Sequence, residues 1–92
     1  MLALLDIGKE SMKEVLKFSA SWCGPCKALT KTIESAGDLG INILEMDIDD
    51  QLTLAAKYDI RTVPTLVIME NGIELKRKTG AMTLSQLKEF LA

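Results

Sequence analysis

Residues 15–27 read VLKFSASWCGPCK, an apolar run followed closely by the only two cysteines in the chain. The apolar run, residues 15–20, predicts a buried strand that carries one charged residue. A helix from Cys23 or Gly24 to about Ala36 is expected next, because the proline between the cysteines suits a first helical turn, where its missing N–H costs nothing. The sequence therefore predicts a Cys-x-x-Cys pair at the start of a helix, directly after a strand.

A Cys-x-x-Cys pair in this position can hold either two thiols or one disulfide. The unpaired N–H groups and the positive end of the helix stabilise a thiolate on Cys23, and the thiolate is the reactive form of cysteine. The alternatives are a structural disulfide and half of a zinc site. Zinc needs about four ligands, and the chain has no histidine and no third cysteine, so two chains would have to share one ion. The pattern favours dithiol–disulfide exchange.

Strands and helices are expected to alternate along the chain. The expected elements, in order, are an edge strand at 2–7, one or two helical turns at 9–14, the strand at 15–20 with its following helix, a strand at 41–47, a helix at 51–58, strands at 65–69 and 73–78, and a last helix after residue 83. This order, β-α-β-α-β-α-β-β-α, predicts an α/β fold with a central mixed sheet and helices on both faces. Active sites of such sheets lie at the carboxyl ends of parallel strands, where Cys23 is expected.

Local signals indicate where several elements begin and which positions face the core. Asp49 or Asp50 can cap the helix at 51–58, Asn71-Gly72 favours a hairpin turn, and Thr83 can cap the last helix. The apolar positions expected to face the core are Leu29, Ile33 and Ala36 in the first long helix and Leu84, Leu87, Phe90 and Leu91 in the last one.

Length and composition are typical of one globular domain, residues 1–92, with 48% hydrophobic and 26% charged residues. A net charge of −2 gives no reason to expect nucleic-acid binding, and the basic run at 76–78 is interpreted as a solvated strand edge. No apolar run approaches the roughly 20 residues that span a bilayer, and the first residues do not resemble a secretion signal. We expect a cytoplasmic protein without nucleic-acid or membrane partners.

Four motifs resemble those of the thioredoxin family, in the same order and at compatible spacing. Trp22-Cys-Gly-Pro-Cys-Lys27 matches the family's active-site run, and Arg61-Thr-Val-Pro-Thr65 resembles its loop with a cis proline. Asn71-Gly72 matches its hairpin turn, and Thr79-Gly80-Ala81 matches its glycine loop before the last helix. The resemblance extends from about Val15 to the end of the chain and implies a thioredoxin fold.

The resemblance also implies a role for each matching position. Cys23 would be the exposed nucleophile and Cys26 the buried resolving thiol, with Cys23–Cys26 as the redox-active disulfide. The Val63 backbone would pair with an extended substrate segment. Pro64 would be cis, although the bare sequence favours trans. The implied substrate-binding residues are Trp22, Gly24, Pro25, Val63, Pro64, Gly80 and Ala81.

A family member of this kind would reduce disulfides in protein substrates and would be recycled by a reductase, expected to be a flavoprotein. We expect a monomer that binds no metal and no cofactor besides its own disulfide. Two alternatives remain open. One is a glutaredoxin-like carrier recharged by glutathione, which Gly24-Pro25 disfavours because those proteins usually carry Pro-Tyr there. The other is a non-catalytic interaction subunit.

Two charged positions depart from the family pattern. Lys17 stands where most members have a buried aspartate beneath the resolving cysteine, and Glu45 stands where the neighbouring strand usually has a lysine. Either the two form a swapped ion pair, or both side chains extend to solvent. A swapped pair would leave Glu45, a partly neutral Lys17 or water to deprotonate Cys26. We predict that Lys17 lowers the pKa of the Cys26 thiol through its charge and is not an essential base.

Overall fold

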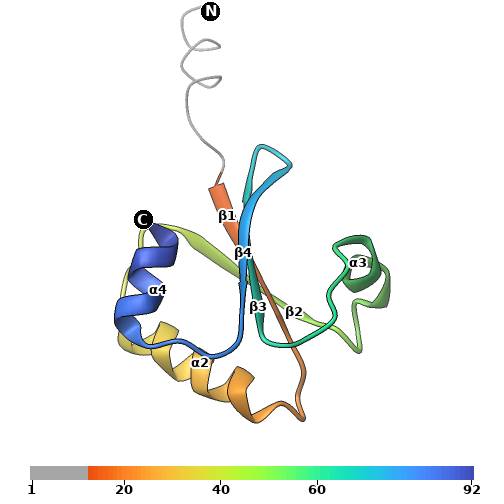
Figure 1. Ribbon diagram of the computed structural model, residues 1–92, viewed down its shortest axis with the longest axis horizontal. Helices are drawn as coiled ribbons and strands as arrows, with labels where there is room; N and C mark the ends of the chain where they lie inside the picture. The colour runs from red at the N-terminus through yellow and green to blue at the C-terminus, as the bar shows by residue number, and fades with distance from the viewer. Residues whose placement is uncertain (1–12) are drawn as a thin grey trace, which may run out of the picture.

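The computed structural model describes residues 13–92, which form four strands and three helices (Figure 1). The expected strand at 2–7 and most of the expected helix at 9–14 lie outside the described residues. Lys13 and Glu14, the last two residues of that helix, are instead in a strand, because both pair with β3 and Glu14 also pairs with β2. The elements are β1 (Lys13–Ser19), α2 (Gly24–Ser35), β2 (Asn42–Asp47), α3 (Leu52–Lys57), β3 (Thr65–Glu70), β4 (Ile73–Thr79) and α4 (Leu84–Leu91).

The strands form one mixed sheet in the order β2-β1-β3-β4. The β1–β2 pair is parallel, whereas β1–β3 and β3–β4 are antiparallel. β1 therefore lies inside the sheet and β4 lies at one edge, where all seven of its residues are exposed. This confirms the mixed sheet, and it confirms residues 76–78 as part of a solvated strand edge.

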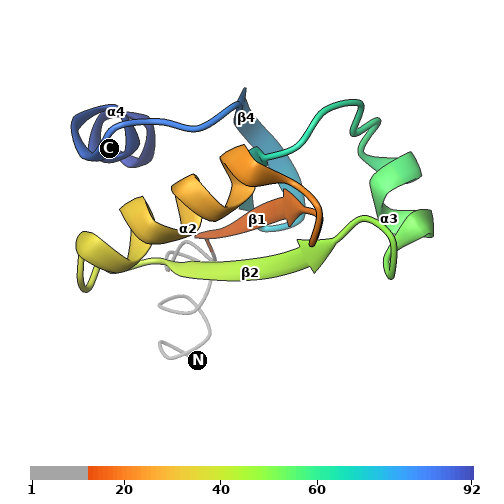
Figure 2. The ribbon, with the colours of Figure 1, turned by 90° about the horizontal axis from the view of Figure 1, so that it is seen from below.

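Helices cover both faces of the sheet, as expected. On one face α2 and α4 pack against a core built from alternate strand residues, while α3 packs against the other face (Figures 1 and 2). The first core contains Val15, Leu29, Leu66, Ile68, Met82, Leu87 and Phe90, and the second contains Leu16, Phe18, Val67 and Met69. The predicted core faces of the two longer helices are confirmed, since Leu29, Leu87 and Phe90 are buried and the other predicted positions are partly buried.

Two of the three predicted local signals are confirmed. Thr83 and Gln86 form a reciprocal capping box at the start of α4. Asn71 and Gly72 have φ angles of 53° and 84°, as a hairpin turn of this type requires. The predicted aspartate cap of α3 is wrong: Gln51 occupies the N-cap position without a side-chain hydrogen bond. An earlier turn takes its place, because Asp47 Oδ1 accepts the N–H of Asp49 at 2.8 Å.

The carboxyl ends of β1 and β2 bring the cysteines to one edge of the sheet. The N–H of Cys23 donates to the carbonyl of Ala20 at 3.1 Å, so the chain turns directly from β1 into α2. The N–H of Ile48 donates to the carbonyl of Ser19 at 2.9 Å, which holds the end of β2 beside that turn. Within residues 13–92 no helix is long and apolar enough to cross a membrane.

Candidate active site

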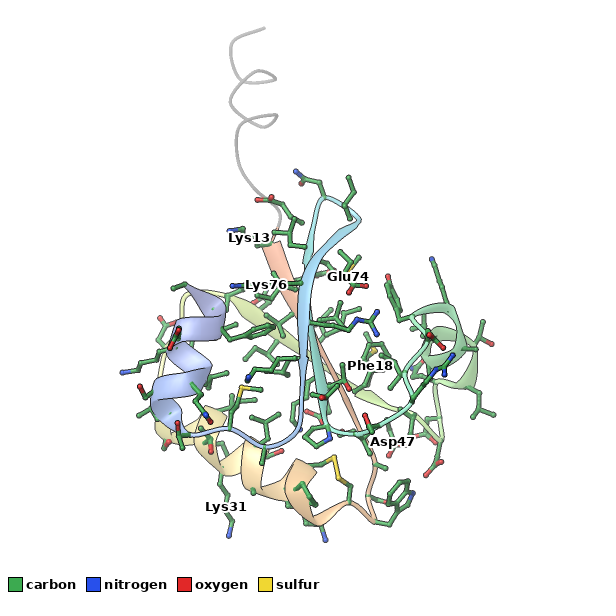
Figure 3. All side chains as sticks on the ribbon, viewed as in Figure 1. Lys13, Phe18, Lys31, Asp47, Glu74 and Lys76 are labelled. Carbon is green, nitrogen blue, oxygen red and sulfur yellow. A yellow bond between two sulfur atoms is a disulfide. The ribbon has the colours of Figure 1, made fainter. Side chains whose placement is uncertain are left out.

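Cys23 and Cys26 form a disulfide at the first turn of α2, visible as the yellow bond in Figure 3. Cys23 is the N-cap residue, and its Sγ accepts the N–H of Cys26 at 3.1 Å. Pro25 lies in the first helical turn, as predicted. A sulfur at this position receives a backbone N–H that has no partner inside the helix, in the field of the helix dipole. A negative charge on Cys23 would be stabilised by both.

The loop before β3 lies against the disulfide. The Val63–Pro64 peptide bond is cis, as the resemblance implied. The Val63 carbonyl oxygen is 3.7 Å from Cys23 Sγ, so a thiol on Cys23 would have an acceptor within reach. The N–H of Gly80 donates to the Pro64 carbonyl at 2.8 Å, and Gly80 has a φ of 92°. The structure therefore joins the glycine loop to the proline loop, with Ala81 exposed next to it.

The two cysteines are almost equally buried, which corrects the expectation of an exposed Cys23. Cys23 is 4% exposed and Cys26 is 2% exposed, because Ala20, Ile48 and Val63 pack around the disulfide. The residues around them are accessible. Trp22 is 68% exposed, and Gly24 and Pro25 are exposed as well. The indole N–H of Trp22 donates to Asp49 Oδ2 at 3.1 Å and thereby fixes the ring beside the site.

A hollow of about 280 Å³ lies between Trp22 and the Val63 loop, and two of its lining residues, Ile48 and Val63, also pack against the disulfide. It is lined by Trp22, Ile48, Ile60, Arg61, Thr62 and Val63. Ile48 and Ile60 were not predicted as site residues, because an apolar residue after a strand carries no signal that separates a binding surface from a core. The hollow has room for an apolar side chain next to Cys23.

Lys17 and Glu45 form an ion pair beneath the cysteines. Their residues are direct neighbours in the parallel β1–β2 register. Lys17 Nζ donates to Glu45 Oε1 at 2.8 Å and to Oε2 at 3.0 Å. The Lys17 side chain is 2% exposed and that of Glu45 is 58% exposed. Of the two arrangements that the sequence left open, the swapped pair is the one found, with only its carboxylate reaching solvent.

Two hydroxyl groups that the sequence did not predict complete this network. Lys17 Nζ also donates to Thr30 Oγ1 at 2.7 Å, and Thr30 Oγ1 donates to the carbonyl of Cys26 at 3.1 Å. Ser19 Oγ donates to Glu45 Oε1. No buried side-chain nitrogen or oxygen in residues 13–92 lacks a hydrogen-bond partner. Thr30 could not be predicted because a single threonine on a helix indicates no contact by itself.

The ion pair and Cys26 line the same open cavity of about 200 Å³. Its lining residues are Lys17, Ser19, Ala20, Ser21, Cys26, Lys27, Thr30, Glu45 and Asp47. Within residues 13–92 no group of three or more histidine, cysteine, aspartate or glutamate side chains is arranged to hold a metal ion.

A disulfide at the N-terminus of the helix that follows a parallel strand, backed by a cis-proline loop, defines a class of protein. That class is the α/β oxidoreductases that exchange a Cys-x-x-Cys dithiol for a disulfide. The Thioredoxin family profile matches residues 5–92. The chain belongs to the thioredoxin family.

Curated relatives agree with this assignment. A thioredoxin of Mycoplasma genitalium is 36% identical over 86 residues, which cover 91% of this chain and 84% of the relative. A thioredoxin of Staphylococcus aureus is 34% identical over 89 residues, covering 94% and 86%.

Solved structures agree as well. Fasciola hepatica thioredoxin superposes with a TM-score of 0.80 at 30% identity, over 98% of this chain and 88% of that one. A mutant thioredoxin from Halobacterium salinarum gives 0.79 at 29% identity, over 99% and 81%. The protein is a protein-disulfide reductase that works by dithiol–disulfide exchange through its Cys-Gly-Pro-Cys motif. Its partners are disulfide-containing proteins and a reductase that recycles it.

Proposed function

We propose that Cys23 is the attacking thiol of this reductase and Cys26 the resolving thiol. The observation that carries the assignment is the position of Cys23 Sγ, which accepts the N–H of Cys26 at 3.1 Å and faces the Val63 carbonyl at 3.7 Å. The start of a 12-residue helix stabilises a thiolate on the first cysteine of the pair and not on the second. The difference between the two cysteines is therefore electrostatic and does not depend on exposure.

The reaction proceeds in two exchange steps. The Cys23 thiolate attacks one sulfur of a substrate disulfide, a Cys23–substrate bond forms, and the other substrate sulfur leaves as a thiolate. Cys26 then loses its proton and attacks Cys23 Sγ, and the first substrate sulfur leaves with the electron pair of the broken bond. The substrate gains two electrons, and the chain is left with the Cys23–Cys26 disulfide that the structure contains.

We propose that the substrate lies across the surface around the disulfide. An extended segment would pair with the backbone of Val63, a partly exposed residue, and a neighbouring side chain would occupy the hollow beside Trp22. Gly80 supports this surface through its hydrogen bond to Pro64. The proposed binding residues are Trp22, Gly24, Pro25, Val63, Pro64, Gly80 and Ala81.

We propose further that residues 1–92 act as one monomeric domain in the cytoplasm, recycled by a flavoprotein thioredoxin reductase. The redox-active disulfide is the only redox group required, with no bound cofactor or metal. A net charge of −2 supports partners other than nucleic acids or membranes.

We propose that Lys17 lowers the pKa of Cys26 by its positive charge. The ammonium is 2% exposed, lines the same cavity as Cys26, and is connected to the Cys26 carbonyl through Thr30. Burial strengthens the interaction between charges because little water screens it. Lys17 donates three hydrogen bonds in the structure, one to Thr30 and two to Glu45, and these fix the position of its charge.

Insulin-disulfide reduction tests the proposed function. We expect reduction with NADPH and a flavoprotein thioredoxin reductase, and little with glutathione and glutathione reductase. Cys23→Ser should abolish turnover, and Cys26→Ser should accumulate a mixed disulfide detectable by mass spectrometry. Faster turnover with glutathione would favour the glutaredoxin-like alternative. Full biological activity of the Cys23→Ser, Cys26→Ser double variant would favour an interaction subunit.

A further inference from the structure

The cavity beside Cys26 contains the groups needed to remove its proton. Cys26 must lose a proton before it attacks Cys23, and its residue is only 2% exposed on the protein surface. The cavity of about 200 Å³ opens to solvent and is lined by both Cys26 and Glu45. It has room for several water molecules, since a buried water needs about 10–15 Å³ of such volume and two to four polar partners.

We propose that Glu45 accepts the proton of Cys26 through water in this cavity, with Lys17, Ser19 and Thr30 as positioning residues. This rests on the proposed roles of the two cysteines. As the S–H bond of Cys26 breaks, the sulfur keeps its electron pair and bonds to Cys23 Sγ, and the substrate leaves as a thiolate. The proton passes through water to a Glu45 carboxylate oxygen and from there to bulk solvent, because the Glu45 side chain is 58% exposed.

The hydrogen bonds of Glu45 explain why this carboxylate is suited to the task. Oε1 accepts hydrogen bonds from Lys17 and Ser19, whereas Oε2 accepts one from Lys17 only. One oxygen is thus held in place and the other has capacity for a water. The Thr30 hydroxyl accepts a hydrogen bond from Lys17 and donates one to the backbone carbonyl of Cys26. The acceptor, the ammonium and the resolving cysteine form one connected unit.

Other charged groups around the cavity are less suited. Asp47 lines the same cavity, but its Oδ1 already accepts the N–H of Asp49 in the turn after β2. Lys27 on α2 also lines it and is a cation. Glu34 on α2 lines a smaller neighbouring cavity with Lys17 and Glu45, one that Cys26 does not line. Glu34 is therefore a matched control for the loss of one carboxylate charge near the ion pair.

The two exchange steps can be separated with 5,5′-dithiobis(2-nitrobenzoate) in a stopped-flow instrument. Reduced protein releases one coloured thiolate when Cys23 attacks, at a rate proportional to the reagent. It releases the second when Cys26 resolves the mixed disulfide, at a rate independent of the reagent. Cys26→Ser should show the first phase only, which assigns the phases. Loss of the first phase in the wild type would contradict the proposed function, whereas the proposal about Glu45 concerns the second phase alone.

The expected signature is the pH dependence of the second phase. With an internal acceptor, the wild-type rate should change by less than about threefold from pH 7 to pH 5, because the thiol form itself reacts by general base catalysis. In Glu45→Gln only free thiolate reacts, and the rate should fall about tenfold per pH unit below the thiol's pKa. Loss of the Glu45 carboxylate leaves the positive charge of Lys17 uncompensated, which favours the thiolate form of Cys26. This change in charge alone would make the rate of the second phase less sensitive to acid, so it cannot explain a steeper fall of that rate. Glu34→Gln should keep the wild-type profile.

The positioning residues supply a test that keeps all charges in place. Ser19→Ala and Thr30→Val should each slow the second phase below pH 6 by about threefold or more without slowing the first, and Thr30→Ser should restore it. These variants decide the matter if Glu45→Gln does not fold. The proposal is overturned if the wild-type second phase itself falls about tenfold per pH unit, if Glu45→Gln follows the wild type, or if Asp47→Asn alone removes the plateau.

Discussion

Two short ion pairs in this molecule differ in what surrounds them. Lys17 and Glu45 pair across β1 and β2 at 2.8 Å, with the lysine 2% exposed. Arg77 and Glu74 pair within β4 at 2.7 Å, with side chains 33% and 32% exposed. The first pair lies beneath the active-site helix, and the second lies on the outer strand, where Figure 3 labels Glu74. Similar distances therefore occur in very different dielectric environments.

A short distance between charged groups does not by itself indicate how much an ion pair contributes to stability. The two hydrogen bonds from Arg77 lower the pKa of the Glu74 carboxyl, and the same contact raises the pKa of Arg77. Such exposed pairs contribute about 0–1 kcal/mol. Burying a lysine costs several kcal/mol that its partner barely repays. Burial of Lys17 is therefore no sign of a gain in stability, and its place in the cavity that Cys26 lines agrees with the role proposed above.

The largest expected difference between the pairs is in stability. Glu45→Ala leaves a buried ammonium with only Thr30 as partner and should lower the free energy of unfolding by about 2–3 kcal/mol, less than for a fully buried pair because Glu45 is half exposed. Glu74→Ala should cost less than about 1 kcal/mol. Urea denaturation of both variants measures this. The double variant Lys17→Met, Glu45→Ala should recover most of the loss, and equal losses for the two single variants would remove the distinction.

A second difference is expected in the chemistry of Cys26. Lys17→Met should raise the pKa of the Cys26 thiol by about one unit, which corresponds to about 1.4 kcal/mol, because a nearby positive charge favours the thiolate. Arg77→Met should leave it unchanged. Alkylation of each cysteine of the reduced protein, followed across pH by mass spectrometry, gives both values. An unchanged Cys26 pKa in Lys17→Met would refute the proposed role of its charge.

The surface pair should contribute a small pH dependence to stability. Because the pKa of Glu74 is lowered in the folded protein, its contribution is present above the unfolded value, about 4.3, and is lost as the pH falls through the lower folded value. The difference in unfolding free energy between wild type and Glu74→Gln should be less than about 0.5 kcal/mol at pH 7, given the exposure of the pair, and should be smaller at about pH 3. Thermal unfolding at both pH values measures it, and a difference that grows in acid would contradict the assigned sign.

The smallest expected difference between the two ion pairs is in how their coupling energies depend on salt. At 1 M salt the Debye length falls to about 3 Å, so the coupling between Glu74 and Arg77 should decrease by a few tenths of a kcal/mol. The Lys17–Glu45 coupling should change less, because the Lys17 side chain is only 2% exposed. Double-mutant cycles for each pair at low and high salt give these coupling energies. Equal salt dependence would mean that the cavity water screens Lys17 fully.

Most of the fold could be predicted from local sequence. The cysteine pair with Pro25 marked the start of α2, Asn71-Gly72 marked the hairpin, and Thr83 marked the start of α4. Where prediction failed, a tertiary contact competed with a local preference. Lys13 and Glu14 belong to β1 because both pair with β3 and Glu14 also pairs with β2. The predicted aspartate caps of α3 were wrong, because the side chain of Asp47, two residues before Asp49, closes an earlier turn.

The irregular edge of the sheet shows the same limit. The register of β3 and β4 shifts between Ile68 and Met69, which leaves Leu75 as an extra residue in β4. The extra residue shifts the alternation of side chains along β4 by one position. Glu74 and Arg77, three residues apart, can therefore lie on the same side of the strand, where they pair. Nothing in the sequence of β4 indicates the bulge, since it depends on how β3 lies against it.

The chemistry of the cysteine pair could be predicted from the sequence alone, since it follows from a four-residue motif at the start of a helix, and both features are local. The tertiary structure decided what surrounds the pair. Cys23 and Val63 are 40 residues apart, Lys17 and Glu45 are 28 apart, and Lys17 and Thr30 are 13 apart. Only the strand order β2-β1-β3-β4, with α2 packed over it, brings these groups within hydrogen-bond distance. Contacts of this range depend on register and packing, which no local pattern encodes.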